Sequence, residues 1–228
     1  MGKCLFVTGT GTDIGKTFVT GLIVKKLVDS GINAGYYKAA ISGIETDAHG
    51  NLTSCDALYV KNFAGLKSEI SDLVSYLYKE PLSPHLAAKI NNRPIEFSKL
   101  ERDFNSAKNS SDFLTIEGSG GIICPLRRDD KEIFGIDDMV KKFNLPVLIV
   151  ALSGLGTINS VVLTVEYLRA RQIPIKGIIF NYFHPGNIME EDNLKTVEEI
   201  TKIPVVAKVC EGDTELKIDI NILKSFYE

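Results

Sequence analysis

Histidine and cysteine are scarce in this sequence, no long hydrophobic run occurs, and neither sign of charge predominates. The cysteines are scattered, and no histidine accompanies them at the spacing of a zinc site, which argues against structural zinc. They are Cys4, Cys55, Cys124 and Cys210. We expect reduced thiols and therefore a cytoplasmic protein. No run could span a membrane, and the net charge of -3 predicts neither a nucleic-acid nor a membrane partner.

The 228 residues suffice for one α/β core, and we predict a single domain over residues 1–228. Short apolar runs alternate with longer helical patterns. Most runs are continuously hydrophobic, which is typical of strands buried on both faces of a parallel sheet. The pattern predicts a doubly wound α/β fold, with a mainly parallel sheet flanked by helices. Predicted strands cover 4–8, 34–39, 113–118, 146–152, 175–181 and 204–209, and predicted helices cover 16–29, 53–64, 96–108, 135–143, 157–171 and 189–202.

The segment GTGTDIGKT, residues 9–17, follows the first predicted strand. A usual phosphate loop has four residues between its first glycine and Gly-Lys-[Ser/Thr], but that first position is Thr10 here, and the nearest glycine is Gly9. Gly15, Lys16 and Thr17 nevertheless stand where a helix begins, and its free N–H groups favour a phosphate. Lys16 can bridge terminal phosphates, and the Thr17 hydroxyl can bind Mg²⁺. We predict a nucleotide site of the P-loop nucleoside triphosphatase type; a glycine-rich turn without a ligand is the alternative.

Charged residues also stand at the ends of two other predicted strands. Ligands of open parallel sheets bind beyond the carboxyl ends of the strands, so these residues are candidates for function. Lys38 is either a second phosphate contact beside the loop or an ordinary surface lysine. Glu117 can hold Mg²⁺ directly or through water, and the alternative is a surface acid. The segment that follows it, Gly118, Ser119 and Gly120, permits close approach of the backbone to a ligand.

Two polar segments follow later strands. The segment SGLGTINS, residues 153–160, opens a helix that Thr157 or Asn159 can cap, and it is either an ordinary cap or a seat for a carboxylate. Asn181 ends a strand, where its amide either reads a base edge or plays a structural role. No catalytic role is assigned to the three histidines, which are His49, His85 and His184.

Taken together, several segments resemble the dethiobiotin synthetase family: FVTGTGTDIGKT, GYYKAAISG, SCDAL, PLSPHLAA, IEGSGG, GLGTIN and the strand-final Asn181. They occur in that family's order and cover most of the chain. The five residues between Gly9 and Gly15 are similar to its lengthened phosphate loop. The resemblance implies an ATP- and Mg²⁺-dependent ligase of biotin biosynthesis. Its substrates would be 7,8-diaminononanoate and CO₂ or bicarbonate, and a carbamate and a carbamic-phosphoric anhydride would lead to dethiobiotin.

The resemblance also implies roles for matching residues. Lys16 and Lys38 would be catalytic, Lys16 at the terminal phosphates and Lys38 at the phosphoryl group in transfer. The metal ligands would be Thr17, Asp56 and Glu117, and only the resemblance singles out Asp56. The ATP-binding residues would be Asp13, Ile14, Gly15, Lys16, Thr17, Phe18, Asp56, Glu117, Gly118, Ser119, Gly120 and Asn181. The substrate-binding residues would be Thr12, Lys38, Ser42, Gly156, Thr157, Ile158 and Asn159, the last four from the other subunit of a homodimer.

Three positions depart from the family pattern. Ala39 stands where a proline usually follows the lysine, Gly154 where some members have a basic residue, and Cys210 where a proline flanks the adenine. Ala39 leaves the backbone at Lys38 less fixed, and Gly154 makes the carboxylate seat depend more on backbone donors. Cys210 affects the loop that binds the base and therefore the nucleotide preference. The alternative function is that of a partitioning-type P-loop ATPase acting through a partner. That class carries a lysine early in its phosphate loop, whereas residues 10–14 contain none.

Overall fold

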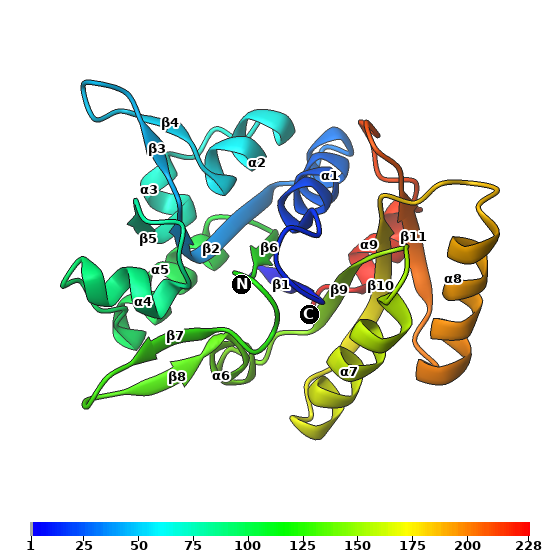
Figure 1. The fold of residues 1–228 in the computed structure, drawn as a ribbon. Coiled ribbons are helices and arrows are strands. Elements are labelled where there is room, and N and C mark those ends of the chain that lie inside the picture. Colours follow the sequence, from blue (N-terminus) through cyan, green and yellow to red (C-terminus); the bar gives the residue numbers. More distant parts are fainter. Residues whose placement is uncertain (1) are drawn as a thin grey trace.

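The computed structural model describes residues 2–228, which contain a seven-stranded sheet with helices on both faces (Figure 1). The strand order is β11-β10-β9-β1-β6-β2-β5, and every neighbouring pair is parallel. The strands are β1 (Lys3–Gly9), β2 (Ala34–Ser42), β5 (Val74–Tyr78), β6 (Phe113–Glu117), β9 (Val147–Leu152), β10 (Ile175–Asn181) and β11 (Val205–Val209). The predicted doubly wound α/β class is confirmed.

Both faces of the sheet are buried, which explains the continuous hydrophobic runs. In β1, Leu5 and Val7 pack in a core shared with α1 and α9, whereas Cys4 and Phe6 point into the opposite core, beneath α4 to α8. The helices are α1 (Lys16–Asp29), α2 (Asp56–Ala64), α3 (Ile70–Leu73), α4 (Pro84–Ile90), α5 (Phe97–Asn109), α6 (Ile136–Lys142), α7 (Thr157–Ala170), α8 (Ile188–Thr201) and α9 (Ile220–Ser225). Among residues 2–228, none of these helices has the length and apolar character needed to cross a membrane.

Several elements differ from the sequence-based expectation. The helix expected over 53–64 begins at Asp56, because residues 52–54 pair instead with residues 45–46. This hairpin, β3 (Glu45–Thr46) and β4 (Leu52–Ser54), extends away from the main sheet, and so does a second one, β7 (Pro125–Arg128) and β8 (Ile133–Gly135) (Figure 1). β5, α3, α4 and α9 were not predicted from the sequence. These elements are short, and short elements leave little periodic signal.

The register of three strands positions the site. β1 lies between β9 and β6, and β6 in turn pairs with β2, so the carboxyl ends of all three strands meet at one edge. Glu117 of β6 is paired with Val7 on one side and with Lys38 on the other. Glu117 ends β6, whereas Lys38 lies in the middle of β2, because that strand continues to Ser42, beyond its predicted end at residue 39. The two residues are nevertheless direct neighbours, near the edge where ligands of such sheets bind.

Candidate active site

The predicted phosphate loop joins β1 to the start of α1. Gly15 is the residue before the helix and has a φ of 78°, a conformation that favours glycine. A Cβ atom at Gly15 would lie 2.1 Å from Nδ2 of Asn181, so the close approach of β10 also requires glycine. The same Nδ2 donates to the carbonyl of Ile14 at 2.9 Å, and the Lys16 ammonium donates to the carbonyl of Gly11 at 2.7 Å. The loop is thus fixed from both sides around the helix N-terminus.

A buried cluster of charge lies beside this loop. The Lys38 ammonium is 2.6 Å from Oδ2 of Asp56 and 2.6 Å from Oε1 of Glu117. The Thr17 hydroxyl donates to the same Oε1 at 2.7 Å, and the Tyr36 hydroxyl donates to Oε2 of Glu117 at 2.9 Å. Lys38 is 4% and Glu117 1% exposed, so neither is the surface residue that the alternatives described. The carboxylate of Glu117 therefore has three donors from two elements, one from α1 and two from β2.

The lysines and acids shift one another's titration. Burial lowers the pKa of Lys38, but the nearby carboxylates of Glu117 and Asp56 outweigh it and leave that pKa raised. Burial, and then the neighbouring charge of Lys38, lower the pKa of Lys16. Partial burial raises the pKa of Asp56, but the ammonium of Lys38 more than compensates and leaves it lowered. Lys38 is therefore held as a cation beside Asp56 and Glu117, a preorganised charge of the kind that stabilises phosphoryl transfer.

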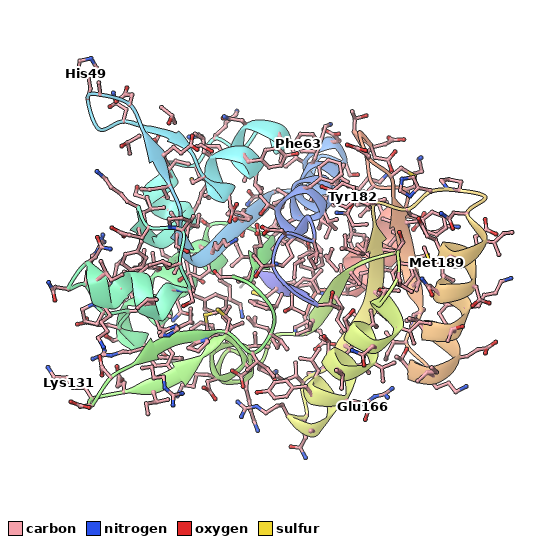
Figure 2. All side chains as sticks on the ribbon, viewed as in Figure 1. His49, Phe63, Lys131, Glu166, Tyr182 and Met189 are labelled. Carbon is pink, nitrogen blue, oxygen red and sulfur yellow. The ribbon has the colours of Figure 1, made fainter. Side chains whose placement is uncertain are left out.

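Most predicted site residues surround one cavity of about 310 Å³. Its lining includes the predicted Thr12, Asp13, Gly15, Lys16, Thr17, Lys38, Ser42, Asp56, Glu117, Ser119 and Gly120. Ile14, Gly118 and Asn181 do not line it, and Asn181 is fully buried with its Oδ1 lacking a partner among residues 2–228. Phe18 lines an adjoining cavity together with Tyr59 and Tyr182, and Tyr59 stacks on Phe63. Figure 2 shows Phe63 and Tyr182. The phosphate loop and the acidic strand end thus share one cleft, with an aromatic wall beside it.

The predicted carboxylate seat lies apart from that cavity, at the start of α7. The expectation that Thr157 or Asn159 caps this helix is wrong, because Gly156 is the residue before it and no side chain caps it. Gly156 has a φ of 89°, which favours glycine, and α7 begins directly afterwards. Thr157 then lies inside the helix, where its buried hydroxyl has no partner among the described residues. Asn159 lines a separate groove together with Gly9 of the first strand.

Sequence analysis missed Tyr36, whose hydroxyl holds Glu117. A signal was present, because residues two apart on a strand share a face, and Tyr36 is two residues before Lys38. Ser119 was predicted as an ATP contact, and its hydroxyl donates to the carbonyl of Ala40 at 2.8 Å. That bond ties the glycine-rich segment after β6 to β2, next to the departure at Ala39.

We expect Tyr36→Phe to lower the free energy of unfolding by about 1–3 kcal/mol, because it removes the donor to a buried carboxylate oxygen. The ring itself, which is 1% exposed, still fits its space. Urea unfolding at neutral pH measures the effect. Tyr59→Phe is the matched control, since that residue is 40% exposed, and it should change stability by less than about 0.5 kcal/mol. Equal stability of the two variants would show that this hydrogen bond contributes nothing.

Comparison with known proteins identifies the family of this chain. A family model described as an AAA domain matches residues 3–213. ATP-dependent dethiobiotin synthetases BioD of Clostridium botulinum (strain Eklund 17B) and Brachyspira hyodysenteriae are 45% and 43% identical to this chain. The alignments cover 100% of it and 99% and 100% of those proteins.

The solved structures that resemble this chain have much lower sequence identity and support the fold alone. They include the MinC:MinD cell division complex of Aquifex aeolicus (TM-score 0.56, 13% identity, covering 98% of this chain and 86% of that one). A ParA family ATPase of Chlorobium tepidum has a TM-score of 0.57 and 15% identity, covering 99% of this chain and 90% of that one. The predicted P-loop fold is thereby confirmed. From the full-length relatives, the chain belongs to the ATP-dependent dethiobiotin synthetase family, whose members are ligases that form carbon–nitrogen bonds.

Proposed function

We propose that this enzyme converts 7,8-diaminononanoate, CO₂ and ATP into dethiobiotin, ADP and phosphate. The observation that carries the proposal is the Lys38 ammonium, which is held between Asp56 and Glu117 beside Lys16 and Thr17 in one cleft. The low pKa of a carbamate means that its oxygen is already anionic, so its attack on the γ-phosphate needs no general base. The reaction instead needs positive charge around the transferring phosphoryl group, which this cleft supplies.

ATP would lie along the phosphate loop. Asp13 to Phe18 would cradle its phosphates, with Lys16 at the terminal ones, and Gly118 to Gly120 would approach from β6. Asn181 would face the adenine through Oδ1, which has no hydrogen-bond partner among residues 2–228, while its Nδ2 holds the loop. The base side is flanked by Tyr182, whose φ of 53° is unusual for a residue other than glycine.

The donor atoms around Lys38 fit Mg²⁺. Thr17, Asp56 and Glu117 offer one hydroxyl and two carboxylates, an all-oxygen set. Mg²⁺ in nucleotide sites is typically held by one or two carboxylates together with phosphates and water. When bound, the ion would neutralise charge on the ATP phosphates. The ammonium of Lys38 contacts the same carboxylates that would hold the ion. Lys38 therefore already supplies positive charge at the position where Mg²⁺ would bind.

The chemistry would proceed in three steps. One amine adds to the carbon of CO₂ and loses a proton to solvent, which gives a carbamate. A carbamate oxygen then attacks the γ-phosphorus, the bond to ADP breaks, and a carbamic-phosphoric anhydride forms. The second amine finally attacks the carbonyl carbon and loses a proton, phosphate leaves with the bonding electrons, and the ring closes. Lys38 would stabilise the transferring phosphoryl group and then the leaving phosphate. Thr12 and Ser42, which line the same cavity, would orient the two amines.

We propose that the enzyme is a homodimer and that the segment Gly156 to Asn159 seats the diamine's carboxylate from the other subunit. The segment lies apart from the cavity of its own chain, and exposed apolar side chains accompany it: Leu155 precedes it, and Ile123 and Leu163 line a groove together with Asn159. Leu155 is 94%, Ile123 66% and Leu163 62% exposed, a pattern typical of interaction surfaces. The cysteines Cys4, Cys55, Cys124 and Cys210 are all free thiols, in keeping with our proposal that the enzyme works in the cytoplasm.

Leu155→Asp is expected to convert the dimer into monomers, because a carboxylate would replace the most exposed leucine of this surface. Sedimentation equilibrium measures the association constant, and we expect it to fall by at least about tenfold, equivalent to about 1.4 kcal/mol. Ile200→Asp is the control, since Ile200 is a half-exposed residue at the far end of α8. If Leu155→Asp and Ile200→Asp have the same association constant as the wild type, the interface does not include Leu155.

The function is tested directly by product analysis. Purified protein with 7,8-diaminononanoate, bicarbonate and Mg-ATP should release dethiobiotin and phosphate in equal amounts, measured by mass spectrometry and a phosphate assay. Omission of the diamine should abolish phosphate release. No dethiobiotin under these conditions, or phosphate release that does not depend on the diamine, would contradict the proposed reaction.

A further inference from the structure

One buried carboxylate takes no part in the function described so far. Glu190 is in the first turn of α8 and only 4% exposed. Buried acids are rare unless they are paired or hydrogen-bonded, because removing a charge from water is costly. The position of Glu190 therefore calls for partners, and its partners come from two different loops.

The first loop follows β10 and leads into α8. The backbone N–H of His184 donates to Oε2 of Glu190 at 2.7 Å, and Nδ1 of the His184 ring lies 2.9 Å from Oε1. This loop begins with Asn181 and Tyr182, which flank the proposed base site. Figure 2 shows Tyr182 and Met189 near the two ends of the loop. Glu190 thus fixes the backbone two residues beyond Tyr182.

The second loop follows β9 and leads into α7. The Ser153 hydroxyl lies 2.7 Å from Oε2 of Glu190 and 2.9 Å from the Tyr182 carbonyl, so its single proton is shared between two acceptors. One turn further along α8, Nδ2 of Asn193 donates to the carbonyls of Ser153 and Gly154 at 2.8 and 3.1 Å. Positions three apart on a helix share a face, so Glu190 and Asn193 of α8 both hydrogen-bond this loop. The loop continues into Gly156, the start of the proposed carboxylate seat.

The charge of Glu190 is stabilised where it lies. Burial raises its pKa, but donors from the His184 backbone, Ser153 and the His184 ring more than offset burial and leave the pKa below the ordinary value. The N-terminal end of α8 adds a favourable dipole. An ionised carboxylate accepts several hydrogen bonds at once, which makes it suited to joining two loops.

We propose that Glu190 is a positioning residue that holds the loop after β10 and the loop after β9 in one fixed arrangement, so that the nucleotide base site and the carboxylate seat depend on the same side chain. This inference rests on the proposed function for the identity of the two ligands. It assigns no contact between Glu190 and either substrate.

Glu190→Ala should raise KM for ATP and KM for the diamine together, each by about tenfold, while kcat changes less. A misplacement of about 1 Å can cost on the order of 100-fold in rate, so a tenfold effect corresponds to a modest loss of order. Substitution of a residue that positions only the nucleotide site would change only the KM for ATP. Ser153→Ala, which removes the bridge and keeps the carboxylate, should raise both constants by a smaller factor.

Two further variants separate positioning from folding. Glu190→Gln keeps the shape and an acceptor oxygen, so it should restore both KM values to within about threefold of the wild type, a change of less than about 1 kcal/mol. Asp192→Ala is the matched control, an exposed acid in the same turn of α8, and it should leave both constants unchanged. If Glu190→Ala does not fold, Ser153→Ala and Glu190→Gln carry the test.

The outcomes are distinct from those of the function test. Binding of ADP with Mg²⁺, measured by calorimetry, needs no diamine, and weaker binding by Glu190→Ala than by Asp192→Ala supports the nucleotide half even if the wild type makes no dethiobiotin. With an active wild type, unchanged KM values in Glu190→Ala overturn the inference, as does a change in only one of them. The inference is equally overturned if Ser153→Ala and Asp192→Ala are indistinguishable.

Discussion

Lys38→Ala is expected to lower kcat by about 100- to 1000-fold, the range found when one preorganised donor to a transition-state charge is removed. Lys38 contacts Asp56 and Glu117 rather than the backbone of the phosphate loop, whose own lysine donates to the carbonyl of Gly11. Nucleotide affinity should therefore stay within a few-fold of the wild type. Calorimetry with ADP and steady-state turnover with the diamine separate the two quantities.

The same variant has a second signature, which does not depend on turnover. Removing the ammonium leaves Asp56 and Glu117 facing each other without a cation, and breaking a buried pair in this way typically costs about 3–5 kcal/mol. Because Mg²⁺ can replace the missing charge, it should raise the melting temperature of Lys38→Ala more than that of the wild type. Lys38→Met, which keeps most of the volume of the side chain, should show the same increase in melting temperature with Mg²⁺ as Lys38→Ala.

Lys67→Ala removes an exposed lysine and controls for the loss of one surface charge. We expect it to match the wild type in kcat, in ADP affinity and in its response to Mg²⁺. Wild-type turnover in Lys38→Ala would refute the role of Lys38 in transfer. A loss of turnover accompanied by an equal loss of ADP affinity would assign Lys38 to binding instead.

The cleft could be predicted from the sequence because the phosphate loop and Glu117 come at the ends of parallel strands. Each continuous apolar run predicts a buried strand, and the polar residue that follows is expected at the ligand-binding edge. Lys38 was predicted in the same way, although β2 continues to Ser42 and Lys38 lies within it. Its burial could not be predicted, because it depends on α2, which brings Asp56 within hydrogen-bonding distance of Lys38.

Residues whose position depends on contacts distant in sequence could not be found in this way. Asp56 follows a small antiparallel hairpin instead of a strand of the main sheet, so only the family resemblance indicated it. Glu190 lies in an amphipathic helix, where an acid in the first turn predicts an ordinary favourable dipole interaction. Its burial results from the packing of α8 beside α7, which no local pattern encodes. The glycine before α7 was recognised, but its left-handed conformation, which excludes a side-chain cap there, was not predicted.

Glu117→Gln is expected to lower the free energy of unfolding by about 3 kcal/mol, the lower end of the range for breaking a buried ion pair, because Lys38 keeps Asp56 as a partner. The amide also places a donor against three existing donors, from Thr17, Tyr36 and Lys38. Because Glu117 is a proposed metal ligand, its loss should weaken Mg²⁺ binding at least as much as the loss of a residue that only hydrogen-bonds a metal ligand. The Mg²⁺ concentration for half-maximal turnover should therefore rise by at least about 10- to 100-fold.

The dependence of this stability loss on pH identifies its cause. The folded protein raises the pKa of Lys38, since Glu117 and then Asp56 outweigh burial. A raised lysine pKa contributes stability that is fully present below the unfolded value of 10.5 and is lost as pH rises through the folded value. The difference in unfolding free energy between wild type and Glu117→Gln should thus stay constant from about pH 6 to about pH 9 and narrow only in more alkaline solution, above the range in which lysines stay charged.

Urea unfolding of both proteins across this pH series measures the difference, and Glu101→Gln, an exposed acid on α5, supplies the control with no expected loss. If the difference in unfolding free energy between wild type and Glu117→Gln changes near neutral pH, the stability loss must depend on another titrating group. A gap below about 1 kcal/mol at neutral pH would mean that Asp56 alone suffices to keep the Lys38 ammonium charged, since surface-type pairs contribute no more than that. In that case the Mg²⁺ requirement, and not stability, would be the property that selects a glutamate at the end of β6.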